Sequence, residues 1–506
     1  MFLGIDLGTS EVKLLLLDDA QLVVGQASAP LQLSRPQPLW AEQQPADWWA
    51  ATERAVAALR ERLPQAWSQV RAIGLSGQMH GAVLLDADDR PLRPAILWND
   101  GRSHAECAEL ERLAPMLHAV AGNLAMPGFT APKLLWLRRH EPALFARVAS
   151  VLLPKDWLRL QLSGAKVSEP SDAAGTLWLD VAARDWSDEL LAACGLTRAQ
   201  MPRLVESNAI SAWVRPELAA RWGLGAEVAI AGGAGDNAAS AIGIGATEAG
   251  DGFISLGTSG VLFVVNERFR PNPASAVHAF CHALPGRWHQ MSVMLSAASC
   301  LRWFTQFCGA ANEAELLAEI EQLGTAERLA APLFLPYLAG ERTPHNDPFA
   351  SGLLFGLTAG TRRALAGYAV LEGVAFALAD GLDALRAAGT GVQRLSLVGG
   401  GARSALWAQL IADALNLEIA VPGSAEAGAA LGAARLAALA SGADPQRVCR
   451  APASAALHAP DPHHHLRLQP RLQRFRALYR QLQGLMAEQA APHPIPADRL
   501  TEIPSP

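Results

Sequence analysis

A short pattern occurs twice in this chain, about half its length apart. The first copy, GIDLGTSEVKLLLL, starts at Gly4, and the second, FISLGTSGVLFVV, starts at Phe253. Each copy reads as a strand, a Gly-Thr-Ser turn and a second aliphatic strand, which predicts a β-hairpin. A chain of 506 residues is long enough for two halves that each bury a core. The repeat therefore predicts a duplicated fold with a cleft between its halves.

The rest of the pattern indicates α/β layering. Near-continuous apolar runs such as VKLLLL and RLSLVGG alternate with helical patterns such as PADWWAATERAVAALRERL. Such runs are typical of strands that are covered on both faces by helices. We expect one domain over residues 1–246, a linker around 247–252, and a second domain over 252–486. The last stretch, 487–506, is rich in Pro and Ala and is predicted to be a flexible tail.

Composition excludes some classes of partner. The net charge of −6 gives no electrostatic case for nucleic acid or for an anionic membrane as the main partner. The six cysteines form no C-x-x-C pair, which is typical of scattered reduced thiols. We see no signal-peptide pattern and no uncharged apolar run long enough to span a bilayer. A cytoplasmic protein without a membrane segment is expected.

The two Gly-Thr-Ser turns are candidates for phosphate binding. Successive N–H groups in a tight glycine turn form a nest for anions, so hairpins facing each other could hold a polyphosphate from both sides. A plain hairpin turn is the alternative, but the paired copies favour the cradle. The residues concerned are Gly8, Thr9, Ser10, Gly257 and Thr258, with Lys13 as a further candidate or an ordinary surface lysine.

The two copies differ at one position in a chemically informative way. Asp6 in the first copy stands where the second copy has Ser255. A carboxylate beside bound phosphates would be repelled unless a cation lay between them, and Mg²⁺ is commonly held by one or two carboxylates plus substrate phosphates. Asp6 is therefore the predicted Mg²⁺ residue.

A second acid follows a Gly-rich turn in VAIAGGAGDNAASAIGIGA, which starts at Val228. Asp236 could simply cap the helix that follows. However, the surrounding Gly and Ala residues would let a bulky ligand approach the backbone, which a cap does not require. VGGGARSALW, at Val398, does not spell the dinucleotide fingerprint G-x-G-x-x-G. There the glycines more plausibly leave room for a flat adenine ring.

Two further turns carry polar side chains suited to a hydroxylated molecule. GQMHG contains Gln78, Met79 and His80, and WNDGR contains Asn99, Asp100 and Arg102. Ligands of open α/β sheets bind beyond the carboxyl ends of the strands, where both turns are expected. Core filling by Met and His, and a loop salt bridge between Asp and Arg, remain the alternatives.

In this order, IDLGTS, GQMHG, WNDGR, GGAGDNAA, SLGTSG, LPYLAGERTPHNDP and VGGGARS resemble the FGGY carbohydrate kinases. The resemblance covers nearly the whole chain. It implies two ribonuclease-H-like domains of the actin, Hsp70 and sugar kinase type, with an interdomain cleft. ATP and Mg²⁺ would lie mostly against the second half and an open-chain sugar against the first.

By matching position, the resemblance also implies roles for single residues. Asp236 resembles the catalytic base, and Asp6 the acid near the metal and phosphates. Met79 and His80 resemble the sugar-contacting pair. The neighbours implied for the sugar are Asn99, Asp100, Arg102 and Asn237, and those for the nucleotide are Thr258, Gly399, Gly400, Gly401 and Ala402. GGAGDN replaces a commoner GGGDN, which adds one methyl group near the base.

The reaction implied is phosphoryl transfer from ATP to a terminal hydroxyl of D-xylulose, giving D-xylulose 5-phosphate. Ribulose, fuculose, gluconate and glycerol remain open as substrates within the class. An actin- or Hsp70-like ATPase without a sugar substrate is the alternative from another class. The resemblance also implies a homodimer.

Overall fold

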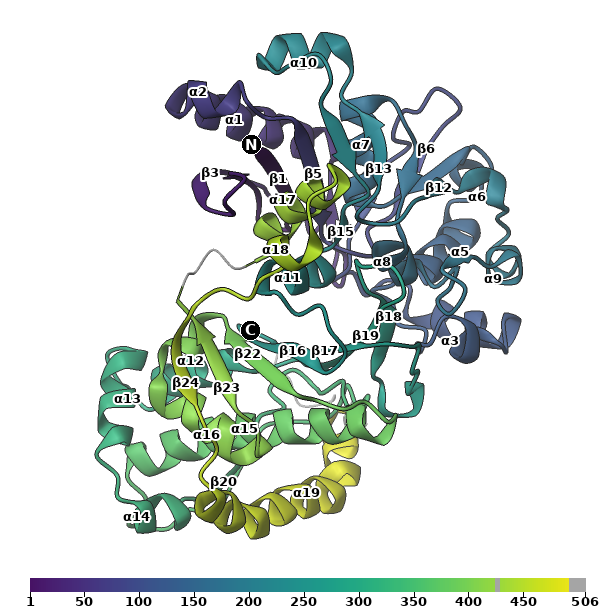
Figure 1. Ribbon diagram of the computed structural model, residues 1–506. Coiled ribbons are helices and arrows are strands. Elements are labelled where there is room, and N and C mark those ends of the chain that lie inside the picture. Colours follow the sequence, from purple (N-terminus) through teal and green to yellow (C-terminus); the bar gives the residue numbers. More distant parts are fainter. Residues whose placement is uncertain (424–427, 491–506) are drawn as a thin grey trace, which may run out of the picture.

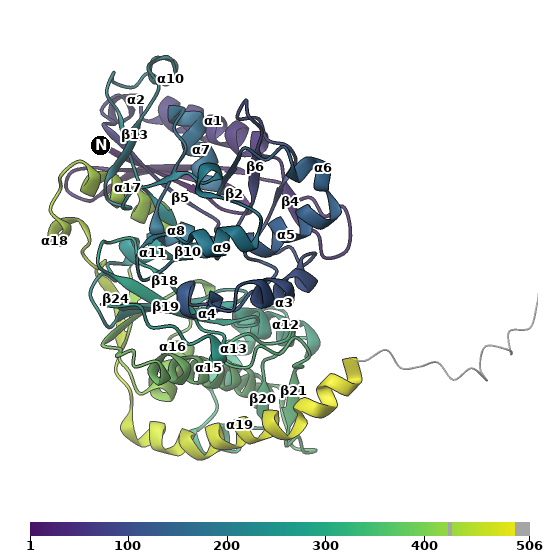
Figure 2. The same cartoon turned by 90° about the vertical axis from the view of Figure 1, so that its right-hand side faces the viewer.

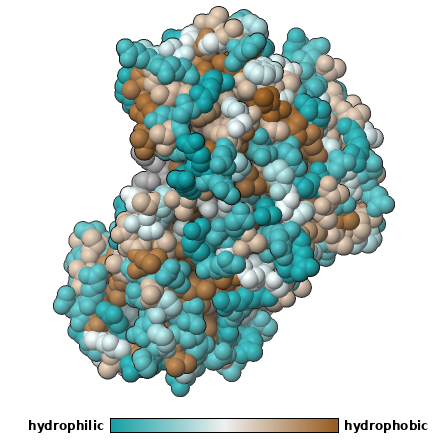
Figure 3. All heavy atoms as spheres, viewed as in Figure 1, coloured by the Kyte–Doolittle hydropathy of each residue, from teal (hydrophilic) through white to brown (hydrophobic). Residues whose placement is uncertain are grey.

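The computed structural model describes residues 1–423 and 428–490. Two lobes are stacked along the long axis of the molecule, each built on a mixed sheet with helices packed against it (Figure 1). The first half of the chain forms the upper lobe in this view, and most of the second half forms the lower lobe. The space-filling view shows the surface hollowed on one side where the two lobes meet (Figure 3).

The first sheet places three parallel strand ends at one edge. β1 is antiparallel to β2 and parallel to β5, and β5 is parallel to both β14 and β15. In spatial order the strands are β13 (Ile210–Trp213), β14 (Ala229–Ala231), β5 (Ala72–Gly77), β1 (Phe2–Leu7), β2 (Glu11–Leu17) and β3 (Val23–Pro30), with β15 (Ala234–Gly235) also on β5. The carboxyl ends of β1, β5 and β15 therefore meet.

The second sheet repeats this plan. β16 is antiparallel to β17 and parallel to β22, as β1 is to β2 and β5. Its strands in order are β18 (His278–Cys281), β19 (Trp288–Met294), β17 (Gly260–Asn266), β16 (Asp251–Leu256), β22 (Arg394–Val398), β23 (Ile419–Pro422) and β24 (Ser454–His458). Both predicted hairpins are confirmed, and so is the alternation of strands and helices.

The two hairpin turns are not identical. In the first, Leu7 pairs with Val12, whereas in the second Leu256 already pairs with Gly260. The second loop is therefore one residue shorter than the first. Sequence identity within LGTS does not reveal this difference, because the residue after the turn sets the register of the returning strand.

Short strands brace the loops around the sheets. They pair as β4 (Glu42–Gln43) with β7 (Ala95–Ile96), β6 (Val83–Leu85) with β8 (Ser150–Leu152), β9 (Val167–Ser168) with β12 (Arg203–Leu204), β10 (Leu179–Asp180) with β11 (Asp185–Trp186), and β20 (Leu333–Leu335) with β21 (Leu353–Phe355).

Helices cover the sheets of both lobes. In the first half they are α1 (Pro45–Arg62), α2 (Pro64–Trp67), α3 (His104–Leu113), α4 (Leu117–Val120), α5 (Thr130–His140), α6 (Pro142–Phe145), α7 (Pro154–Ser163), α8 (Pro170–Ala173), α9 (Asp188–Ala193), α10 (Pro216–Trp222) and α11 (Asp236–Ile244). In the second half they are α12 (Ala298–Phe307), α13 (Glu313–Glu321), α14 (Thr325–Leu329), α15 (Arg363–Ala387), α16 (Ala405–Leu415), α17 (Ala429–Ala440), α18 (Pro445–Val448) and α19 (Pro462–Ala490).

Helix α17 packs outside the lobe that most of the second half of the chain forms. It comes from the second half of the sequence but lies against the sheet of the upper lobe (Figures 1 and 2). A Cβ atom built on Gly4 of β1 would lie 2.0 Å from the Ala430 carbonyl oxygen, and one on Gly74 of β5 would lie 1.8 Å from that of Ala433. The backbones touch directly, so the stretch predicted as one domain over 252–486 contributes a layer to both lobes.

The two halves of the chain also share one hydrophobic core cluster. Phe253, Phe263 and Phe280 of the second half pack in the same buried cluster as Phe129 and Trp178 of the first. Burial of large aromatic side chains is the main source of stability at such a contact.

The longest helices belong to the lower lobe. By length and composition α15 could cross a membrane, but 94% of its most apolar window is buried inside the fold, as in the core helix of a globular domain. Helix α19 runs along the outside of the lower lobe (Figure 2). It includes residues 487–490 of the predicted tail, and 491–506 lie outside the described residues.

Candidate active site

Three turns meet where the parallel strands of the first sheet end. Asp6 of β1 pairs with Ser76 of β5, which in turn pairs with Ala234 of β15. Two strand spacings of about 4.8 Å place the ends of β1 and β15 about 10 Å apart. The first hairpin turn, GQMHG and the turn that carries Asp236 are thus neighbours, as the sequence predicted.

Asp236 begins helix α11 and is not its cap. The cap position is Gly235, which offers no side-chain hydrogen bond. One carboxylate oxygen, Oδ1, accepts hydrogen bonds from the amide of Asn237 (2.7 Å) and from its Nδ2 (2.9 Å). Among the described residues, Oδ2 has no hydrogen-bond partner. Asp236 can therefore accept a proton from a ligand without giving up the contact that fixes its orientation.

Burial and then the charge of Asp6 raise the pKa of Asp236 to about 6, against hydrogen bonds from Asn237 that lower it. A carboxylate with this pKa is ionised at neutral pH but binds a proton more readily than an exposed aspartate. That combination suits a general base.

Asp6 has the properties expected of a cation ligand. Its Oδ1 is buried and has no hydrogen-bond partner within the described chain. Burial raises the pKa of Asp6 to about 6, against the Ser76 hydroxyl and then the charge of Lys13, which lower it. An orphaned carboxylate oxygen at a strand end, beside a second acid, fits Mg²⁺ with its preference for oxygen ligands. Asp6 is the residue that would hold the ion.

A hydrogen-bond network joins the first turn to GQMHG. The hydroxyl of Thr9 donates to Oε1 of Gln78 (2.9 Å) and accepts from the indole nitrogen of Trp98 (3.0 Å). The Nε2 group of Gln78 donates to Gln43 (3.1 Å). In the described part of the chain, the amides of Thr9 and Ser10 have no acceptor, whereas that of Gly8 closes the turn on Glu11 (3.0 Å). The first turn thus retains free N–H groups for an anion.

Met79 and His80 sit against a segment that the sequence analysis did not single out. Nδ1 of His80 lies 2.7 Å from the Gly175 carbonyl oxygen. Since that oxygen can only accept, Nδ1 carries the proton and Nε2 is left as an acceptor. Burial lowers the pKa of His80 to about 3, so the ring is neutral. The site therefore offers a lone pair to a hydroxyl donor.

The same segment reaches the turn that carries Asp236. The hydroxyl oxygen of Ser171 in α8 accepts a hydrogen bond from the backbone N–H of Gly235 (3.2 Å). A Cβ atom on Gly175 or on Gly235 would lie within 3.0 Å of the Met79 side chain. The only signal in the sequence was the run of small residues in SEPSDAAGT, which resembles an ordinary loop.

The WNDGR turn divides into two parts. Asp100 and Arg102 form a buried ion pair with bonds of 2.7 and 2.9 Å, and their side chains are 0% and 1% exposed. Arg102 also contacts Glu42 at 2.7 Å. This is the loop salt bridge that the sequence left open. It orients both side chains, while the sugar contact of Asp100 and Arg102 stays a prediction. Asn99 stays a candidate for binding the sugar, because its buried Oδ1 has no partner among the described residues.

A cavity of about 540 Å³ is lined by residues of both halves of the chain, among them Asn237, the neighbour of Asp236. Its size is typical of small-molecule sites. The lining residues are Asn237, Ser240, Ile244, Phe253, Ser255, Leu397, Val398, Gly399, Gly400, Ala402, Arg403, Val421, Pro422 and Gly428. Three of the four residues predicted at the glycine turn are thus on its wall, and Asn237 connects it to the sugar side.

The remaining nucleotide candidates lie elsewhere. Gly401 packs against Leu256, where a Cβ atom would approach to 2.5 Å. The carbonyl groups of Gly257 and Thr258 accept from the amides of Ala298 (2.8 Å) and Ala297 (2.9 Å), which braces the second turn against α12. The side chain of Thr258 is exposed, outside the lining of the cavity.

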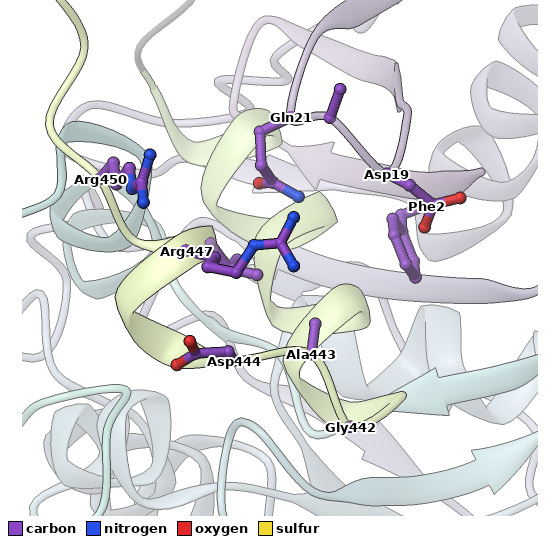
Figure 4. Close-up of a pocket in the computed structure, with 10 residues that line it drawn as sticks. Phe2, Asp19, Gln21, Gly442, Ala443, Asp444, Arg447 and Arg450 are labelled. Atoms are coloured by element: carbon purple, nitrogen blue, oxygen red, sulfur yellow. The ribbon is translucent and has the colours of Figure 1, made fainter.

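Another hollow, of about 410 Å³, lies between the loop after β2 and the segment around α18 (Figure 4). Phe2, at the start of β1, is one of its lining residues, whereas Asp6 of the candidate site lies at the opposite end of that strand. Its lining includes none of the predicted site residues. Since ligands of such sheets bind beyond the carboxyl ends of the strands, this hollow is not the candidate active site.

Comparison with known proteins agrees with this geometry. The N-terminal domain profile of the FGGY family of carbohydrate kinases matches residues 1–243, and the C-terminal domain profile matches residues 252–441. A xylulose kinase from Escherichia coli is 51% identical over 96% of this chain and 100% of its own length. A xylulose kinase from Klebsiella pneumoniae is 52% identical over 86% of this chain and 89% of its own.

Solved structures show the same fold. A crystal structure from Brucella ovis, named as a xyloylose kinase, superimposes with a TM-score of 0.93 at 52% identity, over 96% of this chain and 99% of that one. A xylulose kinase from Rhodospirillum rubrum superimposes with a TM-score of 0.90 at 30% identity over the same shares. The predicted two-domain sugar kinase fold is therefore confirmed. The chain belongs to the FGGY family of carbohydrate kinases.

Proposed function

We propose that this protein transfers the γ-phosphoryl group of ATP to a primary hydroxyl of D-xylulose, giving D-xylulose 5-phosphate. Family membership makes it a carbohydrate kinase, and relatives about half identical to it are named as xylulose kinases. The single observation that carries the proposal is the position of Asp236. Its carboxylate, with Oδ2 unpartnered among the described residues, is bonded to Asn237, which lines the cavity that both halves of the chain share.

The chain's own residues supply three elements of such a transfer. Asp236 accepts the proton of the attacking hydroxyl, which raises the nucleophilicity of that oxygen. The free amides of Thr9 and Ser10 donate to phosphate oxygens as charge develops on them. Asp6 would hold Mg²⁺, which supplies charge neutralisation for the phosphates when it is bound.

The sugar would lie against the first half. Nε2 of neutral His80 accepts from one hydroxyl, and Oδ1 of Asn99 is a second buried acceptor. Acceptors without an internal donor favour a ligand that brings its own O–H groups, as an open-chain sugar does. Met79 supplies an apolar surface between the two turns.

The nucleotide would occupy the 540 Å³ cavity. Gly399 and Gly400 leave its wall without side chains, so a flat ring can approach the backbone. Ser255 lies in the same lining, at the position equivalent to Asp6. A hydroxyl there does not repel phosphate, which would explain why only one hairpin carries the acid.

A coupled ADP assay with MgATP over a panel of sugars tests the proposal. We expect the highest kcat/KM with D-xylulose, followed at a distance by ribulose, fuculose, gluconate and glycerol. A higher kcat/KM for one of the other sugars would replace the substrate but keep the reaction. ADP release that is independent of every sugar would instead favour an actin- or Hsp70-like ATPase.

Two predictions about the whole protein accompany this function. We expect a homodimer, which light scattering of the purified chain measures directly. We also expect a cytoplasmic location, which fractionation of the source cells tests.

A further inference from the structure

A fully buried lysine lies behind the turn that carries His80. Lys133, in the first turn of α5, is 0% exposed. Its Nζ donates to the carbonyl oxygen of His80 (2.8 Å) and to that of Gly128 (2.8 Å). In the part of the chain that the structure describes, no carboxylate lies within 4.0 Å of this ammonium group. The reaction described above does not use it.

A buried lysine without a carboxylate is costly for a protein to maintain. Removing an ammonium group from water carries a large penalty, and two carbonyl oxygens compensate only part of it. Burial accordingly lowers the pKa of Lys133 to about 7, although the charge of Asp100 opposes this. An apolar side chain of similar length would fill the same space without the free-energy cost of removing a charge from water. The presence of an amine therefore needs a physical reason.

The backbone conformation of His80 supplies a reason for the buried amine. Its φ of +69° is in the left-handed region, where residues other than glycine are uncommon and strained. Two donors meet on its carbonyl oxygen, Nζ of Lys133 and the hydroxyl of Thr130 (3.1 Å). These bonds hold the peptide in the orientation that directs the His80 ring toward Gly175.

The second acceptor of Lys133 connects this turn to another wall of the site. Gly128 precedes Phe129, whose ring centroid lies 4.6 Å from that of His80. A Cβ atom on Gly128 would lie 2.5 Å from the carbonyl oxygen of Trp98, so the WNDGR turn rests on it. One ammonium group thus fixes two turns that border the sugar site.

We propose that Lys133 is a positioning residue for the sugar: it holds the carbonyl of His80 and thereby fixes where the His80 imidazole offers its acceptor. The proposal rests on the proposed function, because it assumes that His80 contacts the substrate. It adds a residue from α5 whose own side chain lies behind the binding surface.

Lys133→Met keeps the length of the side chain and removes its donors. With the sugar that the wild-type protein phosphorylates fastest, we expect the sugar KM to rise about 10- to 100-fold, the loss typical of one or two hydrogen bonds from a charged donor. The ATP KM and kcat should stay close to wild type. Lys133→Gln, which retains an N–H donor, should give an intermediate KM. Lys166→Met, at a half-exposed lysine bonded to Asp89 (2.8 Å), is the matched control.

A double-mutant cycle distinguishes positioning from a general structural role. In a His80→Ala background, Lys133→Met should raise the sugar KM clearly less than it does in the wild type, because the imidazole that it positions is gone. Equal KM increases in both backgrounds would overturn the proposal, as would a parallel loss in kcat and in both KM values. Should Lys133→Met fail to fold, Thr130→Val removes the second donor to the same carbonyl and must raise the sugar KM in the same background-dependent way.

Failure of this proposal is distinguishable from failure of the proposed function. An active wild-type enzyme with an unchanged sugar KM in Lys133→Met and Thr130→Val would refute only the role of Lys133. A wild-type protein that phosphorylates none of the sugars would refute the function, and the positioning proposal with it.

Discussion

The hydroxyl of Thr9 donates a hydrogen bond of 2.9 Å to Oε1 of Gln78. The first residue belongs to the turn proposed to bind phosphate and the second to the turn proposed to border the sugar. The two turns follow neighbouring parallel strands, and the bond joins them directly. A shift of either turn therefore reaches the other directly.

Thr9→Val tests this link. The change keeps the shape of the side chain but removes the donor to Oε1 of the buried Gln78 and the acceptor for the indole N–H of Trp98, which is 47% exposed. Of the two partners, only Gln78 is left with an unpaired group away from solvent. We expect kcat/KM for the sugar to fall about tenfold or more. Steady-state kinetics at saturating ATP measures it. Thr9→Ser retains the hydroxyl and should remain close to wild type; an equal loss in both variants would assign the effect to the methyl group instead.

The pH profile tests Asp236 as the base. Burial, and then the charge of Asp6, raise its pKa to about 6, and the base must be ionised to accept a proton. We expect kcat/KM to be constant above about pH 7 and to fall tenfold per pH unit well below pH 6. Initial rates between pH 4.5 and 8.5 with a stable coupling system show this limb.

Asp236→Asn provides the companion measurement. The amide preserves the shape but cannot accept the hydroxyl proton, so kcat should fall by about 10²- to 10⁴-fold. Binding of ATP, followed by equilibrium titration, should persist, because the lining of the nucleotide cavity is unchanged. Near-normal turnover by this variant is the result that would remove Asp236 from its role.

The sequence predicted where the residues of this site lie better than it predicted what each side chain contacts. Gln78 was placed at the carboxyl end of its strand by a rule that needs only strand order, and the family resemblance brought Asp6 and Asp236 to the same site. Asp100 and Arg102 were assigned to the sugar on residue type, strand-end position and the family resemblance, with a loop salt bridge as the alternative. Whether a carboxylate and a guanidinium face a ligand or each other depends on burial that pairing with Glu42 creates, and no local pattern encodes that contact.

Long-range packing was the other limit. Helix α17 has an apolar, alanine-rich sequence that predicts a buried helix, but nothing in it indicates which lobe it covers. Gly175 contacts His80 through its own carbonyl oxygen, and Lys133 donates to the carbonyl oxygens of His80 and Gly128. A contact made by a carbonyl oxygen leaves no trace in the sequence. The glycine turn at 399–402 was predicted as a unit, yet Gly401 faces Leu256 because a tight turn points successive residues in different directions.

Ser255→Asp tests why only one hairpin carries an acid. Ser255 lines the cavity proposed for ATP, so a carboxylate there would repel the phosphates or require a second cation. We expect the ATP KM to rise about tenfold or more, with the sugar KM little changed. Ser255→Ala, which adds no charge, should stay close to wild type. An unchanged ATP KM in Ser255→Asp would place the nucleotide elsewhere.

Stability should depend on the same carboxylates. The pKa values of Asp6 and Asp236 are both raised to about 6 in the folded protein, above the ordinary value near 4. The folded state therefore binds protons more tightly than the unfolded state, and ionisation of these groups destabilises it as pH rises from about 4 through 6. Asp236→Asn should raise Tm by a few degrees at pH 8 and leave it unchanged at pH 4. Calorimetry at both pH values measures the difference, and a gain confined to pH 4 would contradict the sign.

The contact between α11 and α17 sets a limit on side-chain size. A Cβ atom on Gly432 of α17 would lie 1.7 Å from the Ala239 carbonyl oxygen of α11, and backbone cannot move aside as a flexible side chain can. Gly432→Ala must push the helices apart, at a cost of about 1–3 kcal/mol or more, so we expect a Tm lower by several degrees. Since Asp236 begins α11, kcat should fall as well. Gly484→Ala in α19 is the matched control. Within the described chain, no atom beyond its own helical turn and chain neighbours lies within 4 Å of the added Cβ, and alanine should stabilise the helix by about 0.5–1 kcal/mol. Equal Tm values for the two variants would mean that α17 can shift without strain, and that the close approach of the two backbones does not fix the geometry of the lobes.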